Sequence, residues 1–219
     1  MFDLDKYQRI SRRIDSYREQ MIELQIALTA IPAVGPENGG DGELLKADFL
    51  KQYLMKSGFH NIHNCDAKDN RVSSGIRPNL VTTIKGNNKN KSVWIITHLD
   101  IVPPGELSLW NHDPYSAYLK DGHIFGRGTE DNQQDMVASI FAAKAIIDEG
   151  LTPVNSINLA FVSDEETSSH MGLNYMIDSH DNLFSSDDLI VVPDSGNPEG
   201  SLIEIAEKSI LWFCFKTKG

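Results

Sequence analysis

Apolar side chains recur at helical spacing near the start of the chain. They predict one amphipathic helix over residues 6–30, which Pro32 would end. The stretch "IPAVGPENGGDG" that follows is rich in Gly and Pro and predicts a loop. A second helix is expected over "ELLKADFLKQYLMKSG", with Gly58 as its C-cap. The spaced residues of the first helix are Ile10, Ile14, Tyr17, Met21, Leu24 and Leu28.

Apolar, β-rich runs alternate with helical runs in the rest of the chain. The runs at 79–86, 92–100, 156–166 and 188–196 predict four strands. "DMVASIFAAKAIIDEG", between the second and third strands, and "MGLNYMIDS", between the third and fourth, predict helices. Strands that alternate with helices are typical of an α/β sheet with helices on both faces. The last run, 201–219, predicts two strands that belong partly elsewhere.

Composition and charge narrow the class of protein. Hydrophobic residues make up 40% and charged residues 23% of the 219 positions, as in a globular domain. No apolar run reaches the roughly 18 residues of a membrane span, and the charged N-terminus lacks the apolar core of a secretory signal. The formal net charge of −11 argues against a nucleic acid as partner. Cys65 and Cys214 lie far apart, which favours a reducing cytoplasm and leaves oxygen and imidazole as ligands for any metal.

Acidic and imidazole groups follow three of the predicted strands. They are His98 and Asp100 after the second strand, Asp164, Glu165 and Glu166 after the third, and Asp194 after the fourth. Ligand sites of open α/β sheets lie outside the carboxyl ends of the strands, so each strand–helix unit could deliver one side chain to the same edge. Asp131, at the start of the long helix, either joins this set or acts as an N-terminal cap. For any one of these acids alone, a solvated surface residue is the simpler interpretation.

A set of convergent carboxylates requires a cation, because the negative charges otherwise repel. One imidazole among carboxylates suits zinc, manganese or cobalt better than calcium. We expect His98 to bind the metal, and we expect Asp100, two positions along the same strand, to orient the imidazole of His98. Of the adjacent Glu165 and Glu166, one could bind metal while the other moves a proton, a standard means of hydrolysing an amide.

Six motifs in a fixed order resemble those of one enzyme family. They are "THLDIVPPG", Trp110, "DPY" at 113–115, "KDGHIFGRGTEDN", "SDEE" and "PDSG". The order resembles that of the co-catalytic zinc peptidases and deacylases, which include aminoacylase, acetylornithine deacetylase, succinyl-diaminopimelate desuccinylase, glutamate carboxypeptidase and carnosinase. The similarity runs from about residue 20 to the end of the sequence. The combination is specific, although each motif alone is a weak signal.

The resemblance implies a set of metal ligands. His98 and Asp194 would bind one ion, Glu166 would bind a second, and Asp131 would bridge the two. The ions would be divalent, with Zn²⁺ as the first choice and Co²⁺ or Mn²⁺ as alternatives. The peptide bond between Asp131 and Asn132 is expected to be cis, as in many relatives.

The same resemblance assigns the proton chemistry and the reaction. Asp100 would support the metal-binding His98. Glu165 would be the general base that takes a proton from the bridging water and passes it to the leaving amine. The implied reaction is hydrolysis of an amide bond in an N-acyl-amino acid or short peptide by a deacylase, dipeptidase or carboxypeptidase.

The resemblance also implies an architecture, a three-layer α/β/α catalytic domain with a mostly parallel mixed sheet. Residues 1–205 would form the N-terminal part of this domain, and 206–219 would begin a lid and dimerisation domain or the junction to it. Most of the lid and the last metal-binding His of the relatives would then be missing from this sequence. The full-length protein would form a homodimer through its lid. The run "DNQQD" departs from the Lys or Gly of relatives and would mark a subgroup.

Two other interpretations of the chain remain open. It could be an inactive or assembly-dependent fragment, which keeps the fold, binds metal weakly and needs the missing lid and C-terminal segment. It could also be a plain α/β domain with acidic loops, which zinc would not stabilise against heat.

Three single residues carry expectations of their own. Arg127, between two glycines, is expected to form a structural ion pair rather than to bind substrate. Asp164 is expected to hydrogen-bond nearby backbone. Cys214 alternates with aromatic residues and is expected to be buried.

Overall fold

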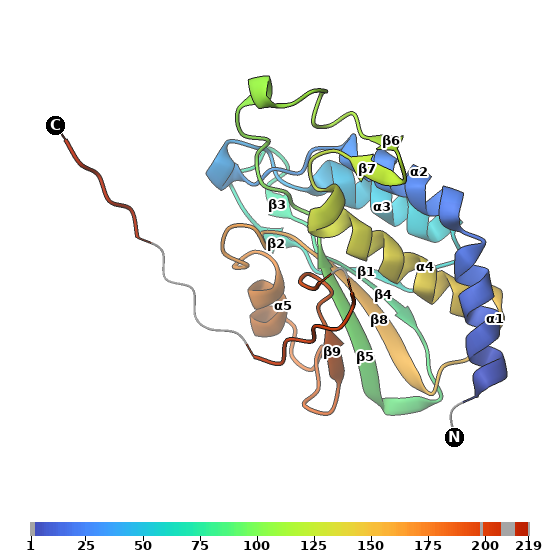
Figure 1. Cartoon of the computed structure of the whole chain (residues 1–219). Helices are drawn as coiled ribbons and strands as arrows, with labels where there is room; N and C mark the ends of the chain where they lie inside the picture. Colours follow the sequence, from blue (N-terminus) through green and yellow to red (C-terminus); the bar gives the residue numbers. More distant parts are fainter. Residues whose placement is uncertain (1–2, 198, 207–212, 219) are drawn as a thin grey trace.

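The computed structural model describes residues 3–197, 199–206 and 213–218, and a five-stranded sheet forms its centre (Figure 1). The strand order is β1–β4–β8–β5–β9. The strands are β1 (Ile62–Asn64), β4 (Leu80–Ile84), β5 (Asn88–His98), β8 (Asn155–Val162) and β9 (Leu189–Val191). β5 pairs in parallel with β8 and β9, whereas β4 runs antiparallel to β1 and β8. All the strands except β4 therefore point the same way, which confirms the expected mostly parallel mixed sheet.

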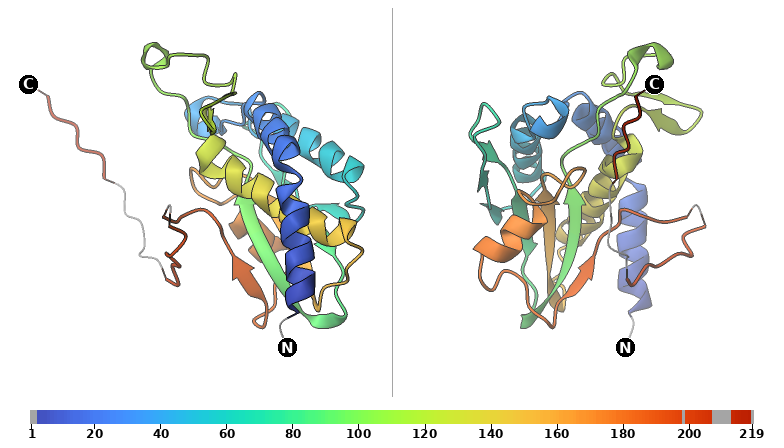
Figure 2. Two further views of the ribbon diagram at one scale, coloured as in Figure 1. Left: turned by 45° about the vertical axis from the view of Figure 1, so that its right-hand side comes forward. Right: turned by 90° about the vertical axis from the view of Figure 1, so that its left-hand side faces the viewer.

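Helices cover both faces of the sheet and complete three layers (Figure 2). One face carries α1 (Leu4–Asp15), α2 (Arg18–Thr29), α3 (Leu44–Lys56) and α4 (Gln134–Asp148), and the other carries α5 (Leu173–Ser179). Side chains alternate along β8, because successive residues of a strand point to opposite faces. Leu159 and Phe161 pack with α2, α3 and α4, whereas Ala160 and Val162 pack with α5. The three-layer α/β/α architecture is confirmed.

The N-terminal helical region is two helices, so the single helix expected over 6–30 is wrong. α1 ends at Asp15 and α2 begins at Arg18. The hydroxyl of Ser16 donates to the carbonyl of Arg13 at 2.6 Å, a local bond that competes with continuation of the helix. The break also turns Tyr17 inward, where its hydroxyl donates to Asp148 at 2.6 Å. A contact between residues 131 apart in sequence therefore accompanies this boundary, and periodicity cannot reveal it.

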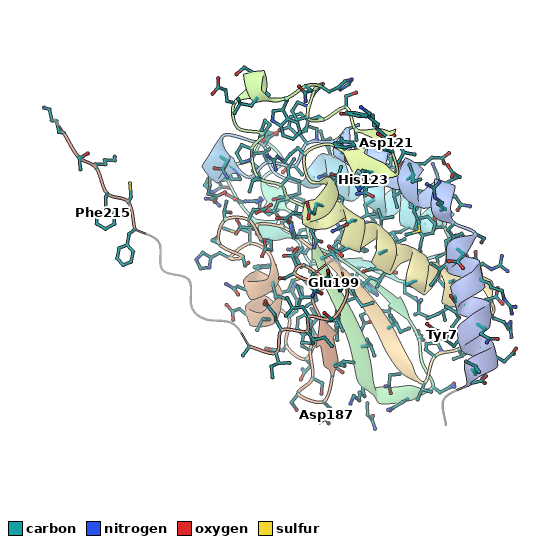
Figure 3. All side chains as sticks on the ribbon, viewed as in Figure 1. Tyr7, Asp121, His123, Asp187, Glu199 and Phe215 are labelled. Atoms are coloured by element: carbon teal, nitrogen blue, oxygen red, sulfur yellow. The ribbon has the colours of Figure 1, made fainter. Side chains whose placement is uncertain are left out.

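The remaining short elements connect the layers. The C-cap of α3 is Ser57, one residue before the predicted Gly58. Gly58 follows it with a φ of +94°, which glycine adopts without steric cost, so the helix ends where the sequence indicated. The elements that the sequence pattern did not predict are the edge strand β1, the short strands β2 (Ala67–Lys68), β3 (Ile76–Arg77), β6 (Tyr118–Lys120) and β7 (His123–Phe125), and the helical turns η1 (Pro36–Asn38), η2 (Leu107–Leu109) and η3 (Thr129–Gln133). Figure 3 labels Asp121 and His123 at the tip of the β6–β7 hairpin. Among the described residues, none of the helices combines the length and apolar character needed to cross a membrane.

The segment after β9 does not form the expected strands within the described residues. Residues 201–206 and 213–218 have neither helix nor strand, and 207–212 and 219 lie outside the described part of the chain. Phe215, labelled in Figure 3, is 89% exposed. Cys214 is also exposed, so the expectation that it is buried is wrong, since no described segment packs over it. The division of the chain at residues 205 and 206 stays a prediction.

Candidate metal centre

The carboxyl ends of β5, β8 and β9 lie at one edge of the sheet. His98, the last residue of β5, is paired with Val162, the last residue of β8. The loops that follow these two strands therefore leave the sheet at the same level, and β9 adds a third loop on the other side of β5. This arrangement follows the rule that parallel strands deliver their ligand-binding loops to a common edge.

His98 forms a three-residue cluster with Asp131 and Asp194. Its side chain is 2% exposed, and Nε2 lies 2.9 Å from Oδ1 of Asp131 and 3.7 Å from Oδ1 of Asp194. One ligand atom from each residue lies within 4.8 Å of the other two. Within the described part of the chain, no other group of His, Cys, Asp and Glu meets this criterion. The cluster joins the end of β5, the turn η3 and the loop after β9.

Asp100 ties this cluster to the loop after β8. Its buried carboxylate accepts hydrogen bonds from the backbone N–H groups of Glu165, at 3.1 Å, and Glu166, at 3.0 Å. Nδ1 of His98 lies 3.0 Å from the Asp100 carbonyl oxygen and 3.5 Å from its carboxylate. An Nδ1–H that donates to this carbonyl leaves Nε2 facing the two aspartates of the cluster. Asp100 therefore fixes both the imidazole and the backbone of the glutamate pair.

The two adjacent glutamates have different surroundings. Glu165 is 43% exposed, and its Oε2 lies 3.9 Å from Nε2 of His98. Glu166 is half-buried and is not a member of the three-residue cluster. Its Oε1 is buried and has no hydrogen-bond donor. A buried carboxylate oxygen without a partner costs free energy, and a bound cation would remove this cost.

The electrostatics of the cluster also suit a cation. Burial lowers the pKa of His98, but hydrogen bonds with Asp100 and with the two aspartates of the cluster outweigh this effect and raise the pKa to about 12. Burial and the nearby Asp131 carboxylate raise the pKa of Glu166 to about 7. The site thus favours positive charge and resists further negative charge. Its imidazole and carboxylate donors fit a divalent metal ion of the zinc type.

Asn132 is a site residue that sequence analysis did not identify. It is 1% exposed, its Nδ2 donates to Oδ1 of Asp194 at 2.5 Å, and its Oδ1 accepts from the backbone N–H of His98 at 3.3 Å. The peptide bond between Asp131 and Asn132 is cis, as expected. Its place beside Asp131 was the only signal in the sequence, because both hydrogen bonds join distant segments.

A buried ion network lies beneath the glutamate loop. Arg77 and Glu43 are both 0% exposed, and Nε of Arg77 donates to Oε2 of Glu43 at 2.6 Å. Nη2 of Arg77 lies 3.8 Å from Asp164, the residue before the glutamate pair. Asp164 accepts from the backbone N–H of Met171 at 3.0 Å and from two loop hydroxyls, so the prediction that it bonds nearby backbone is confirmed. The network holds the loop 164–171 from inside.

Comparison with known proteins identifies the family. The model of peptidase family M20/M25/M40 matches residues 94–207, slightly more than half of the chain, and this range contains every residue of the cluster. The chain therefore belongs to peptidase family M20/M25/M40, a family of metal-dependent hydrolases. This result confirms the family resemblance and the class of enzyme.

Two curated relatives show how far the similarity extends. An uncharacterised metallohydrolase of Methanococcus maripaludis is 46% identical over 209 residues, which cover 93% of this chain and 50% of the relative. A succinyl-diaminopimelate desuccinylase of Cereibacter sphaeroides is 28% identical over 200 residues, which cover 89% of this chain and 49% of the relative. The chain thus spans about half the length of the curated relatives that it matches.

Solved structures share the fold. Human carnosine dipeptidase 1 matches with a TM-score of 0.72 at 20% identity, over 86% of this chain and 41% of the dipeptidase. A Bacillus subtilis protein described as a dinuclear metal-binding peptidase of the M20 family matches with a TM-score of 0.51 at 13% identity, over 75% of this chain and 39% of that protein. At these identities the likeness shows the three-layer fold.

Proposed function

We propose that this chain forms the metal-binding core of a hydrolase that cleaves amide bonds in N-acyl-amino acids or short peptides. The observation that carries the proposal is the cluster of His98, Asp131 and Asp194, with a carboxylate oxygen of Glu165 3.9 Å from the imidazole. Membership of the M20/M25/M40 family supports it. The desuccinylase and the dipeptidase named above support the substrate class.

Four side chains would hold two divalent ions, most simply Zn²⁺, with Co²⁺ and Mn²⁺ as alternatives. His98 and Asp194 would bind the first ion, Glu166 the second, and Asp131 both. The short contacts within the cluster support the first set, and the unpartnered Oε1 of Glu166 supports the second. When bound, the ions would polarise the scissile carbonyl and lower the pKa of the attacking water.

Glu165 would move the proton. Its side chain is the more exposed of the glutamate pair, so it can reach a substrate that enters from solvent. It would accept a proton from the attacking water and donate it to the leaving amine. Asp100 would position both this residue and His98 through the hydrogen bonds described above. For the complete protein, the proposal extends to a lid, a homodimer formed through it and a cytoplasmic location.

The variant Glu165→Gln separates the proton transfer from metal binding. We expect two zinc ions per chain by elemental analysis after dialysis, both in the wild type and in this variant. Hydrolysis of a panel of N-acyl-amino acids and dipeptides should fall by about 10²-fold or more in Glu165→Gln, since a general base contributes factors of this size. His98→Ala should lose zinc as well as activity. Glu23→Gln, which removes an exposed acid on α2, should keep both.

Each part of the proposal can fail separately. A wild-type chain that retains no zinc would reject the metal centre. Zinc binding without turnover by the wild type would favour the fragment that needs a missing lid. Normal turnover by Glu165→Gln would reject the role of this residue while leaving the metal centre in place.

A further inference from the structure

We propose that Arg127 binds a carboxylate of the substrate in the cavity beside the metal centre. This inference rests on the proposed function and names the residue that would recognise the negatively charged group of the substrate. The cavity has a volume of about 900 Å³, and its walls include Asp131 and Asp194 of the cluster. Arg127 lines the same cavity, so a ligand there can contact both the arginine and the metal centre.

Among the described residues that line this cavity, Arg127 is the only basic one. Four carboxylates share the wall with it, and they belong to Glu130, Asp131, Asp135 and Asp194. Two of these acids are proposed metal ligands, and a bound ion would neutralise them. A free carboxylate that enters the cavity would then find a single positive side chain. Recognition of a substrate anion therefore has one candidate on this wall.

The guanidinium of Arg127 has no charged or hydrogen-bonding partner within the described part of the chain. No ion pair or side-chain hydrogen bond involves it, and its Nε is buried without an acceptor. The structural ion pair expected from the sequence is therefore absent, since the acids on the same wall lie out of its reach. Guanidinium groups hold five N–H donors in a planar fork that matches a carboxylate. A buried donor without an acceptor costs free energy, which an incoming carboxylate would offset.

The side chain is nevertheless held in place. Its guanidinium carbon lies 5.3 Å from the ring centroid of Trp110, a cation–π contact. The indole N–H of Trp110 donates to the carbonyl of Pro104 at 2.8 Å, and the backbone N–H of Arg127 donates to the carbonyl of Pro114 at 2.7 Å. Gly128 follows with a φ of +82°, a conformation that other residues rarely adopt. A restrained, unpaired arginine is a preorganised anion site, because little entropy is lost on binding.

The proposal predicts a preference for acids over amides that depends on Arg127. The probes are N-acetyl-leucine and N-acetyl-leucinamide, which differ only in the terminal carboxylate, and calorimetric titration measures both. The zinc-loaded wild type should bind the acid about tenfold more tightly or better, as a charge-assisted bidentate contact implies. Arg127→Gln should bind the two probes equally, and Arg127→Lys should keep part of the preference. Arg12→Gln, which removes an exposed charge on α1, should keep all of it.

The outcomes separate this inference from the function on which it rests. Zinc content is measured on the same samples, and circular dichroism and melting temperature check that each variant is folded. A chain that holds zinc but shows no preference, or a preference that survives Arg127→Gln, overturns the inference and leaves the metal centre intact. A chain that holds no zinc overturns the proposed function, and titration of that metal-free chain then decides the role of Arg127 by the same comparison.

Discussion

Arg77 carries a positive charge at a position with no solvent exposure. Its partner Glu43 is also fully buried, and Asp69 and Asp164 lie 3.6 Å and 3.8 Å from the guanidinium. Moving two charges out of water is costly, and each half of such a pair is tolerated only because the other is present. The pair links β3 to the start of α3, and Arg77 also lies near Asp164 in the loop that follows β8.

Removal of one member of this pair should destabilise the whole domain. We expect Glu43→Gln to lower the free energy of unfolding by about 3–5 kcal/mol, because Arg77 is left as a buried charge without its main partner. Urea denaturation followed by circular dichroism measures the change. Arg18→Gln breaks an exposed pair with Glu19 and should cost about 1 kcal/mol or less. Equal costs for the two variants would show that the buried pair has no special role.

The junction between β8 and α5 is an element boundary on which the site depends. Gly172 precedes α5, and a Cβ at this position would lie 1.8 Å from the carbonyl oxygen of Ser163. Ser163 directly precedes Asp164 and the glutamate pair. Backbone cannot yield as a flexible side chain can, so any side chain at 172 must move one of the two segments.

Gly172→Ala should therefore affect both stability and the metal centre. We expect a loss of about 1–3 kcal/mol in the free energy of unfolding, together with weaker zinc binding in a calorimetric titration. Gly150→Ala is the matched control, because Gly150 has a φ of +63° but no atom within 4 Å of an added Cβ. Gly150→Ala should lower the free energy of unfolding by about 1 kcal/mol and leave zinc affinity unchanged. Unchanged zinc affinity in Gly172→Ala would show that α5 does not position the loop.

Tyr17 lies at the break between α1 and α2 and donates to Asp148 of α4. This contact should make the free energy of unfolding sensitive to alkaline pH. Burial and the hydrogen bond to Asp148 raise the pKa of Tyr17 above its ordinary value of 10.0. Above pH 10 the unfolded chain loses this proton first, so the free energy of unfolding falls as pH rises, by up to about 1.4 kcal/mol per unit. Urea denaturation at pH 8 and pH 11 measures the fall.

Tyr17→Phe should show a smaller alkaline loss, because it has no phenol to ionise. It should also be less stable at pH 8, by about 1 kcal/mol, since its hydrogen bond to Asp148 is missing. Tyr118→Phe, on the β6–β7 hairpin, keeps Tyr17 and should keep the alkaline loss. The same pH dependence in Tyr17→Phe and wild type would assign the effect to another group.

At the scale of the whole molecule, a net charge of −11 is combined with a convergence of acids at one sheet edge. Mutual repulsion of these acids opposes folding, and a bound cation relieves it. Zinc should raise the melting temperature, since an ion at a hundred times its dissociation constant adds about 2.7 kcal/mol to stability. Differential scanning calorimetry with zinc and then a chelator measures the shift.

The control for this shift is His98→Ala, which keeps the acids but removes the imidazole. It should melt at nearly the same temperature with and without zinc. Calcium should stabilise the wild type less than zinc does, because imidazole is a poor ligand for it. No shift with zinc in the wild type would favour the plain α/β domain with acidic loops.

The periodic elements could be predicted from the sequence because hydrophobic burial leaves a local trace. The alternation of apolar runs predicted β4, β5, β8, β9, α4 and α5. The polar side chains at the ends of two strands and at the start of the long helix gave the candidates His98, Asp194 and Asp131 for the cluster. The chemistry of the candidate ligands and the order of the motifs were enough to predict the family. In these cases the physical cause, one buried face or one strand end, lies within a few neighbouring residues.

Contacts between distant segments decided the rest. Tyr17, at the break between α1 and α2, donates to Asp148, Asn132 donates to Asp194, and the buried charge of Arg77 is paired with Glu43. Arg127 was expected to form an ion pair and forms none within the described part of the chain, although acids close to it in the sequence line the same cavity. The partner of a side chain depends on where the order of the strands and the course of the loops place it. A local pattern of residues does not predict which distant segment will lie beside it.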